Sequence, residues 1–311
     1  MKCGQNLDYL GVVDLDMTVL PTGAAGSENK RVKMNYSFQL LCTDSLPIQP
    51  DRAVLQIIAD YESGDKGTST AVPDEVLSTV QPCEHTTGGD DYSTGDNVAQ
   101  SLSTQTSDVR SHETAFACHV ADAMKWTFIE MGYNCDLAII NGGFIRGDRL
   151  YPPGGPLMRS DMMQEMPFPR CPVLLRMTGS EILLGLEQML SGAHAPVGSF
   201  PHLSAGISAM YDLKEEPMHR IKSVTIDSAA GAENDASDGG GVCWLSREYL
   251  VAVSDFYCNK EGDGVEAFTN KEVVARCKDV IGTVVSNYFR TLTFVSGSPQ
   301  GRLVPVQRSN T

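Results

Sequence analysis

Two stretches near the start of the chain alternate apolar and polar residues, which is the pattern of strands with one apolar face. The apolar positions of the first stretch are Val13, Leu15, Met17 and Val19. Those of the second are Val32, Met34, Tyr36, Phe38 and Leu40. A helical spacing begins at Pro50-Asp51 and places Val54, Leu55, Ile58 and Tyr61 on one face. Residues 1–64 are therefore predicted to form a β-hairpin followed by a helix.

The centre of the chain predicts a buried strand and two amphipathic helices. The strand is the apolar run Asp136-Leu-Ala-Ile-Ile140. The first helix is predicted to open at Arg110-Ser-His-Glu-Thr114, because the apolar residues that follow recur four apart at Phe116, Val120, Met124 and Phe128. The second opens at Thr178-Gly-Ser-Glu181, where the Thr-x-x-Glu spacing suits a capping box. Further strands are predicted at 221–226 and 249–253.

Two stretches rich in Ser, Thr, Gly and Asp interrupt these elements. The first runs from about Ser63 to Val109, and the second from Asp227 to Gly241. Such compositions bury too little apolar surface to stay ordered, so we expect a flexible linker at 65–109 and a second flexible loop. Their acidic clusters leave a calcium loop as an alternative, but the regular Asp-x-Asp-x-Asp-Gly spacing with a terminal Glu is missing.

The composition narrows the class of protein. The chain has 311 residues, 41% of them hydrophobic, which is enough for one large or two ordinary domains. Its net charge of −15 argues against binding to nucleic acid or an anionic membrane. No apolar run approaches the about 20 residues of a membrane span, and neither terminus carries an apolar signal or anchor segment. Nine dispersed cysteines without Cys-x-x-Cys suit a reducing compartment, so we expect a cytoplasmic location.

The histidines do not predict a metal site. A two-metal hydrolytic site needs a cluster of His and Asp ligands that hold the ions about 3.5–4 Å apart. His112 and His119 are seven residues apart, which would place them on one face of a helix. They would be two turns apart there, too distant to share an ion. No pair has His-x-His or His-Glu-x-x-His spacing among the six, which are His85, His112, His119, His194, His202 and His219. We expect no cofactor and no metal on this chain.

The strongest candidate for a binding site is Asn141-Gly-Gly-Phe-Ile-Arg146, directly after the buried strand. Ligands of open α/β sheets bind outside the carboxyl ends of the strands. Glycine allows a ligand to approach the backbone closely, and an arginine fork suits hydroxyl or phosphate oxygens. The alternative is a turn that binds nothing.

The ordered set of motifs resembles the C-terminal, nucleotide-binding domain of the 5′-nucleotidase and UDP-sugar hydrolase family. The resemblance covers about residues 105–305 and implies a mixed α/β domain at 110–305, followed by a tail at 306–311. Its motifs are Arg110 with Glu113-Thr114, Asn141-Gly-Gly-Phe-Ile-Arg146, Pro167-Phe168, Thr178-Gly179, Gly198-Ser-Phe-Pro-His-Leu-Ser204, Tyr211-Asp212 and Gly262-Asp-Gly264.

The resemblance also implies roles for single residues. Arg110 would reach the ribose or phosphate of a nucleoside 5′-monophosphate, and Asp263 would bind ribose hydroxyls. Phe168 would stack on one face of the base. The second ring would be Phe256 or Tyr257, because the family's spacing to the aspartate falls on Tyr257. The substrate contacts of the loop after the strand would be Asn141, Gly142, Gly143 and Arg146.

Four departures from the family pattern imply altered recognition. Phe144 replaces a glycine and adds bulk near the pocket. Ala115-Phe-Ala117 stands where Asn-x-Gly is usual, and Ser204-Ala205-Gly206 is one residue longer than Ser-Gly. Glu261 replaces the first glycine of Gly-Gly-Asp-Gly, which restricts the turn there.

The resemblance further implies a preceding metallophosphatase domain with two divalent metal ions of the Zn, Mn, Mg or Ca type. Its histidine-containing motifs, Asp-x-His, Gly-Asn-His-Asp and Gly-His-x-His, do not occur in this sequence. Residues 1–64 resemble only its last hairpin and the connecting helix. The implied reaction is hydrolysis of nucleotide 5′-phosphates. In that reaction this chain would recognise the nucleoside, and we expect the chain alone to be inactive.

Two alternatives remain at this point. The chain can be a non-catalytic protein that sequesters nucleotides, docks to a metallophosphatase or forms a homodimer. It can also be an incomplete gene product whose native form carries the catalytic domain. Members of the family often lie outside the cell, whereas the first residues of this sequence do not have the apolar pattern expected of a signal peptide.

Overall fold

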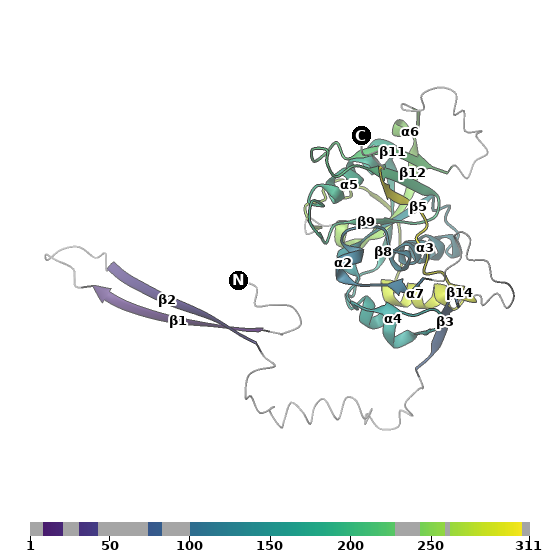
Figure 1. Cartoon of the computed structure of the whole chain (residues 1–311). Coiled ribbons are helices and arrows are strands. Elements are labelled where there is room, and N and C mark those ends of the chain that lie inside the picture. The colour runs from purple at the N-terminus through teal and green to yellow at the C-terminus, as the bar shows by residue number, and fades with distance from the viewer. Residues whose placement is uncertain are drawn as a thin grey trace, which may run out of the picture. The chain divides into compact units, whose positions relative to one another are not determined.

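The computed structural model describes residues 9–20, 31–42, 74–82, 100–227, 243–258 and 262–306 (Figure 1). The chain forms two compact units, Met1–Val72 and Pro73–Thr311. The helix predicted from Pro50, the loop residues 83–99 and 228–242, and Glu261 lie outside the described residues.

The first unit contains the antiparallel hairpin of β1 (Tyr9–Leu20) and β2 (Arg31–Cys42). Tyr9 pairs with Cys42 at one end, and Leu20 pairs with Arg31 at the other. Both strands predicted from the alternating pattern are confirmed.

The second unit is built on a five-stranded mixed sheet. The parallel neighbours β12 and β5 lie inside it, and every other pair of neighbours is antiparallel. This arrangement confirms the predicted α/β fold with a mixed sheet. The strand order is β13 (Glu272–Arg276), β8 (Pro172–Thr178), β12 (Glu248–Ser254), β5 (Leu137–Asn141) and β9 (Pro201–Leu203).

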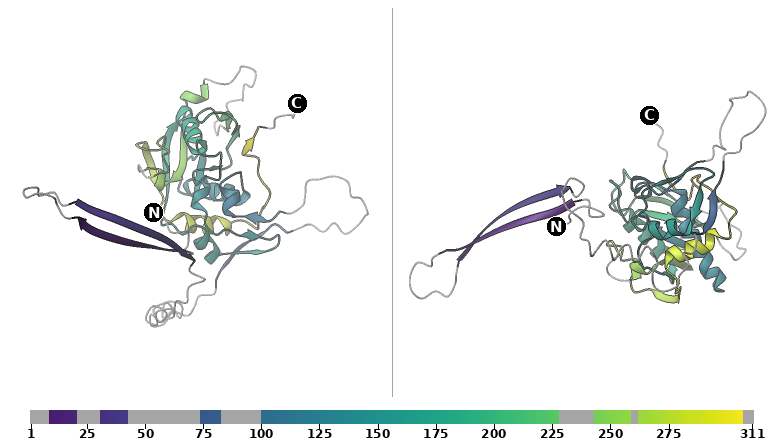
Figure 2. Two further views of the ribbon diagram at one scale, coloured as in Figure 1. Left: turned by 60° about the vertical axis from the view of Figure 1, so that its left-hand side comes forward. Right: turned by 90° about the horizontal axis from the view of Figure 1, so that it is seen from below.

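Helices cover both faces of this sheet (Figures 1 and 2). Side chains alternate across a strand, so Ala138 and Ile140 pack with α3 (Ala115–Glu130) and α7 (Ile281–Phe289) on one face. Leu137 and Ile139 pack with α5 (Gly179–Leu190) on the other. All of β5 is buried, which explains its continuous apolar run.

Hydrogen bonds to capping side chains set where two of the helices begin. The Thr178 hydroxyl accepts a hydrogen bond from Glu181 N at 3.3 Å, and Thr178 N donates to the Glu181 carboxylate at 2.8 Å, so the predicted capping box is confirmed. The earlier helix begins later than predicted. Thr114 caps α3, whereas Arg110 ends the short α2 (Thr106–Val109) four residues before it. A hydroxyl that satisfies an early N–H fixes the helix start there.

Smaller sheets flank the centre. One has the order β11 (Ile221–Ile226), β10 (Ile207–Tyr211) and β15 (Leu303–Pro305). Another has the order β14 (Phe294–Val295), β3 (Val76–Val80) and β7 (Pro156–Met158). The remaining elements are β4 (Leu102–Ser103), β6 (Leu150–Tyr151), α4 (Arg159–Glu165), α6 (Cys243–Ser246), η2 (Gly142–Phe144) and η3 (Asp255–Cys258).

The segment 65–109, predicted to be a linker, contributes β3, β4 and α2 to the second unit. In β3, Leu77 and Val80 are buried, and the strand pairs with β7 and β14. Its partners lie far along the sequence, so local composition did not reveal the pairing.

The carboxylate of Glu113 fixes the C-terminal strand. It is buried, and it accepts backbone hydrogen bonds from Gln300 at 2.6 Å, Gly301 at 2.8 Å and Leu303 at 2.6 Å. Bonds to an ionised acceptor are stronger than neutral ones. This clamp positions β15 beside β10.

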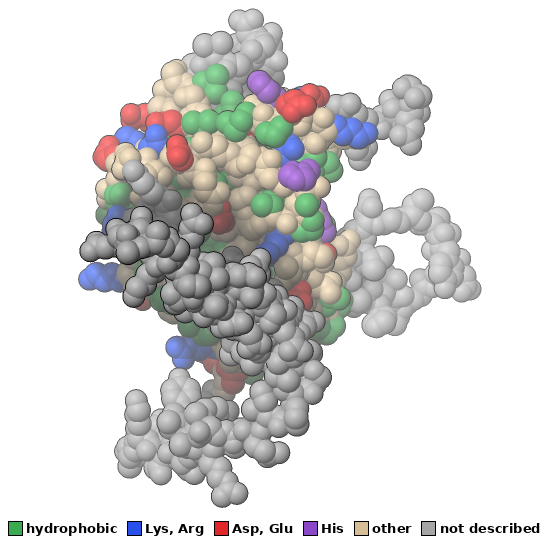
Figure 3. All heavy atoms as spheres, turned by 90° about the vertical axis from the view of Figure 1, so that its left-hand side faces the viewer, with side chains coloured by type: hydrophobic (Ala, Val, Ile, Leu, Met, Phe, Trp, Pro, Cys, Tyr) green, Lys and Arg blue, Asp and Glu red, His purple; other side chains and the backbone are tan. Residues whose placement is uncertain are grey.

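The surface of the second unit mixes charge types. On the face shown in Figure 3, the coloured acidic, basic and apolar side chains are interspersed. Within the described part of the chain, no helix is long and apolar enough to cross a membrane.

Candidate functional site

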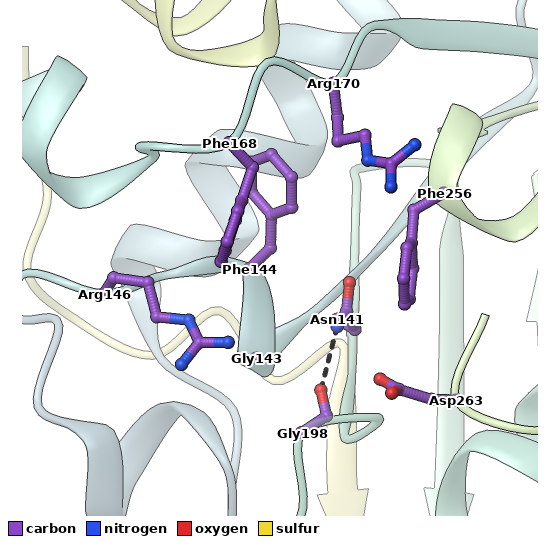
Figure 4. A pocket seen from close by; sticks show the side chains of 9 residues that line it. All are labelled: Asn141, Gly143, Phe144, Arg146, Phe168, Arg170, Gly198, Phe256 and Asp263. Carbon is purple, nitrogen blue, oxygen red and sulfur yellow. Dashed lines mark hydrogen bonds between the residues drawn. The ribbon is translucent and has the colours of Figure 1, made fainter. Parts of the chain in front are cut away.

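A cavity of about 290 Å³ opens at the carboxyl ends of β5 and β12 (Figure 4). Because these strands are parallel neighbours, Asn141 at the end of β5 and Phe256 just after β12 reach the same edge of the sheet. The sequence predicts a binding site at this edge. The lining residues are Asn141, Gly143, Phe144, Arg146, Phe168, Arg170, Gly198, Phe256 and Asp263.

The floor of the cavity is a backbone turn held against the loop before β9. The side-chain amide of Asn141 donates to Gly198 O at 2.9 Å, and Gly143 N donates to the same oxygen at 2.8 Å. A side chain at residue 143 would place Cβ 2.7 Å from Gly198 O. Glycine is therefore required here because two backbone segments touch.

Two phenylalanines form opposite walls (Figure 4). Phe168 is 38% exposed, so its ring is open to a ligand. Phe256 is half-buried on the other side. Phe144 is buried and its ring centroid lies 5.7 Å from that of Phe168, so the bulk that it adds to the loop packs against the Phe168 ring.

The structure separates the two candidates for the second ring. The Tyr257 side chain is fully buried and packs 5.4 Å from Phe268 between ring centroids. Phe256 lines the cavity instead. The structure therefore places Tyr257 in the apolar core, and of the two candidates Phe256 is the one that a ligand in the cavity could contact.

Charged groups gather at one end of the cavity. The Arg146 guanidinium lies 5.1 Å from the centroid of the Phe168 ring, a cation–π distance. Burial lowers the pKa of Arg146, the nearby charge of Arg110 lowers it further, and Asp263 opposes both. Arginine still remains a cation at physiological pH. The exposed Asp263 has a left-handed φ of 50°, which aspartate tolerates better than most residues.

Among the described residues, seven buried side-chain polar atoms lack a hydrogen-bond partner. Three of them are Asn141 Oδ1, Arg146 Nε and Arg110 Nε. A buried polar atom without a partner costs about 1–3 kcal/mol. Asn141 and Arg146 line the cavity, so one acceptor and one donor of its lining residues have no partner among the described residues.

The position of Arg146 depends on Glu165, which the sequence did not single out. The fully buried Glu165 accepts from Arg146 N through its backbone oxygen, and from Gly147 N through its carboxylate, both at 2.8 Å. Tyr151 and Thr104 donate hydroxyl protons to the same carboxylate. Burial raises the pKa of Glu165 above its usual range. These contacts fix the loop that carries Arg146.

Six of the nine predicted site residues line the cavity, and Arg110, Gly142 and Tyr257 do not. Gly142 lies beneath the floor, where its N–H donates to Phe200 O at 2.8 Å. The lining residues without a predicted role are Phe144, Gly198 and Arg170. Gly198 could have been found from its family motif, whereas no pattern in the sequence marks Arg170.

The donor set of the cavity does not suit a metal cluster. Asp263 is its one carboxylate, and none of its lining residues is His or Cys. Within the described ranges, no group of three His, Cys, Asp or Glu side chains could hold a metal ion.

His202 supports the site from below. Its Nε2 lies 2.8 Å from Val109 O, which fixes the tautomer with the proton on Nε2 because the carbonyl can only accept. The side chain is fully buried, and the described residues offer Nδ1 no partner. Burial lowers the pKa of His202 to about 4. Protonation would place a charge in the core beneath Gly142.

We expect this histidine to make the fold acid-sensitive. Since its folded pKa lies below the ordinary value of 6.5, its stabilising contribution is complete above pH 6.5 and is lost as the pH falls towards 4. The loss should be on the order of 2–3 kcal/mol at pH 4.5. His202→Gln keeps an N–H donor for Val109 O but does not titrate. Urea unfolding at pH 7 and pH 4.5 should show a smaller loss in the variant. Equal losses in both proteins would contradict this role.

Comparison with known proteins shows the family to which the chain belongs. The family model of the 5′-nucleotidase C-terminal domain matches residues 93–270, more than half of the chain. The trifunctional nucleotide phosphoesterase protein YfkN of Bacillus subtilis is 31% identical over 170 residues, which are 54% of this chain and 11% of that protein.

Solved structures show the same fold. The 5′-nucleotidase precursor from Thermus thermophilus is 20% identical with a TM-score of 0.61, over 89% of this chain and 47% of its own. The NAD nucleotidase of Haemophilus influenzae is 16% identical with a TM-score of 0.51, over 87% of this chain and 47% of its own. The chain thus spans about half the length of these structures. By the match of the family model, the chain belongs to the family of 5′-nucleotidase C-terminal domains.

Proposed function

We propose that this domain binds the nucleoside part of a nucleotide and so serves a 5′-nucleotidase-type hydrolysis of nucleoside 5′-monophosphates in nucleotide catabolism. One observation carries the proposal. Phe168 and Phe256 stand on opposite sides of one cavity, and polar groups of Arg146 and Asp263 gather at one of its ends (Figure 4). A nucleotide has a matching arrangement, with a flat aromatic base at one end and a polar sugar phosphate at the other.

The base lies between the two rings. Stacking of a nucleobase on an aromatic side chain contributes about 1–3 kcal/mol and tolerates different bases. Phe168 is exposed enough to offer a face, and Phe144 supports it from the side. The walls therefore supply affinity for a ring.

The polar end holds the sugar and the phosphate. The Asp263 carboxylate can accept two ribose hydroxyl bonds, and the unpartnered Asn141 Oδ1 can accept another. Arg146 offers a fork of N–H donors to phosphate oxygens, with the charge of Arg110 nearby. These contacts orient the ligand as well as bind it.

Hydrolysis itself is assigned to a metal site outside this cavity. Cleavage of a phosphate monoester by two divalent ions needs several His and Asp ligands, and the cavity offers only Asp263. The relatives named above are nucleotidases or phosphoesterases by name. We propose that two divalent ions act in a metallophosphatase domain and that the present domain delivers the nucleotide to them.

A calorimetric titration without added metal tests this proposal. We expect the purified chain to bind adenosine and AMP with Kd values between about 1 μM and 1 mM, equivalent to about −8 to −4 kcal/mol. Arg146→Ala should weaken AMP more than adenosine, since the guanidinium meets the phosphate. The absence of binding in a folded sample, or metal-dependent turnover of AMP that Arg146→Ala abolishes, would overturn the proposal.

A further inference from the structure

The cavity has a second cation, Arg170, at the end away from Arg146 and Asp263 (Figure 4). Its guanidinium extends towards the gap between the two walls and lies 5.6 Å from the centroid of the Phe256 ring. Neither a nucleoside's sugar nor its phosphate explains a cation at this end.

The backbone holds Arg170 in place from both sides. Its N–H donates to Phe168 O at 2.8 Å, and its carbonyl accepts from Ile281 N, the first residue of α7, at 2.9 Å. The segment therefore links the first wall to a helix of the core. A side chain that starts from such an anchored position has a limited range of directions.

The position of Arg170 determines which part of a ligand it meets. If Asp263 and Arg146 hold the sugar and phosphate, as proposed above, the base extends between the rings away from them. The edge of the base farthest from the sugar then points to the end of the cavity at which Figure 4 shows the Arg170 guanidinium. In a purine, that edge carries the substituent at position 6.

A guanidinium has five N–H donors and no acceptor. It matches the O6 and N7 acceptors of a 6-oxopurine with two parallel hydrogen bonds. Adenine presents a 6-amino donor in the place of O6. A guanidinium N–H cannot form a hydrogen bond with that donor, so one of the two hydrogen bonds is lost. Larger rings also cover more of the two phenylalanine walls, which favours purines.

We propose that Arg170 makes this site selective for 6-oxopurine nucleosides, with hypoxanthine or guanine as the base, over adenosine. The inference rests on the proposed nucleoside recognition and adds the class of base. Arg170 is a specificity-determining residue in this assignment, because it reads the edge of the base and has no part in holding the phosphate.

A structural role offers a different explanation of the same contact. Arg170 would then only steady Phe256 through the cation–π interaction, and it would affect every base alike. Two substitutions separate these roles. Arg170→Lys keeps a cation near the ring but loses the planar fork, and Arg170→Met removes the charge and keeps an apolar stem.

Calorimetric titration of the full chain with inosine, guanosine and adenosine tests the inference. Inosine and adenosine are a matched pair, since they differ at position 6 and in the N1 proton that follows from it. We expect inosine and guanosine to bind about tenfold more tightly than adenosine, within the range of a bidentate arginine–base contact. Arg170→Met and Arg170→Lys should each reduce this ratio to about one or two, chiefly by weakening inosine and guanosine.

The outcomes distinguish this inference from the function on which it rests. If all three nucleosides bind but adenosine binds as tightly as inosine, the base selectivity is wrong and nucleoside recognition stands. A preference for inosine that survives in both variants would assign the selectivity to another group and overturn the role of Arg170. If no nucleoside binds to a folded sample, both proposals fail.

Discussion

Phe256→Ala is expected to weaken nucleoside binding by about 1–3 kcal/mol, or about 5- to 150-fold in Kd, because the base loses one of its two stacking partners. The ring is half-buried at the rim, so its removal opens the cavity more than it disturbs the core. Calorimetry with a nucleoside measures the change, and urea unfolding checks that the variant is folded. Phe168→Ala should cost a similar factor on the opposite wall.

Tyr257→Phe is the matched control. It changes the neighbouring residue, whose side chain is fully buried and whose hydroxyl has no partner within the described part of the chain. Removing that hydroxyl keeps the packing against Phe268 and relieves the cost of an unpartnered buried polar atom, so the Kd should stay close to that of the parent and the stability should be equal or higher. If Phe256→Ala leaves the Kd unchanged in a folded protein, the assignment of the second stacking ring to Phe256 is wrong.

Gly142→Ala is expected to destabilise the domain by about 3 kcal/mol or more, at the upper end of the cost of overpacking. An alanine Cβ there would lie 1.6 Å from Val109 O and 3.2 Å from His202 Nε2. The first neighbour is backbone, so either the turn after β5 or the segment before Arg110 must move. Urea unfolding followed by circular dichroism gives the free energy.

Gly198→Ala provides the comparison for this effect. Its Cβ would meet its nearest neighbours, Asp263 Oδ2 and Gly143 Cα, at 3.8 Å, which is ordinary contact. We expect its free energy of unfolding to stay within about 1 kcal/mol of the parent, since the lost flexibility of the unfolded chain offsets part of any cost. A Gly142→Ala protein as stable as Gly198→Ala would show that the turn adjusts freely.

Several features could be predicted from the sequence because they depend on neighbours in the chain. The alternation in β1 and β2, the apolar run of β5 and the capping box at Thr178 are all local patterns. The order of the motifs was enough to place Asn141 and Arg146 at the carboxyl edge of a sheet. These patterns also indicated the family, which the family model shows.

Contacts between residues that are far apart in the sequence became visible only in the tertiary structure. Glu113 contacts residues about 190 positions away, and β3 pairs with β14 more than 200 residues later, so neither is visible in local composition. Which of Phe256 and Tyr257 lines the cavity was also decided there. In the short 3₁₀ turn of η3, consecutive side chains point about 120° apart, so only one of two adjacent rings can face the cavity while the other enters the core.

Arg170 is the clearest case of a residue whose place in the site only the tertiary structure shows. The sequence contains an arginine two residues after Phe168 but carries no pattern that connects it to Phe256, which lies 86 residues farther along the chain. Folding brings the two together by pairing β8 with β12 in an antiparallel register that sets Pro172 opposite Ser254. The sequence by itself was enough to predict a candidate site at this edge. The pairing of strands decided which cation lies at its far end, because the antiparallel register of β8 and β12 brings the segment that precedes β8 and the segment that follows β12 to the same edge.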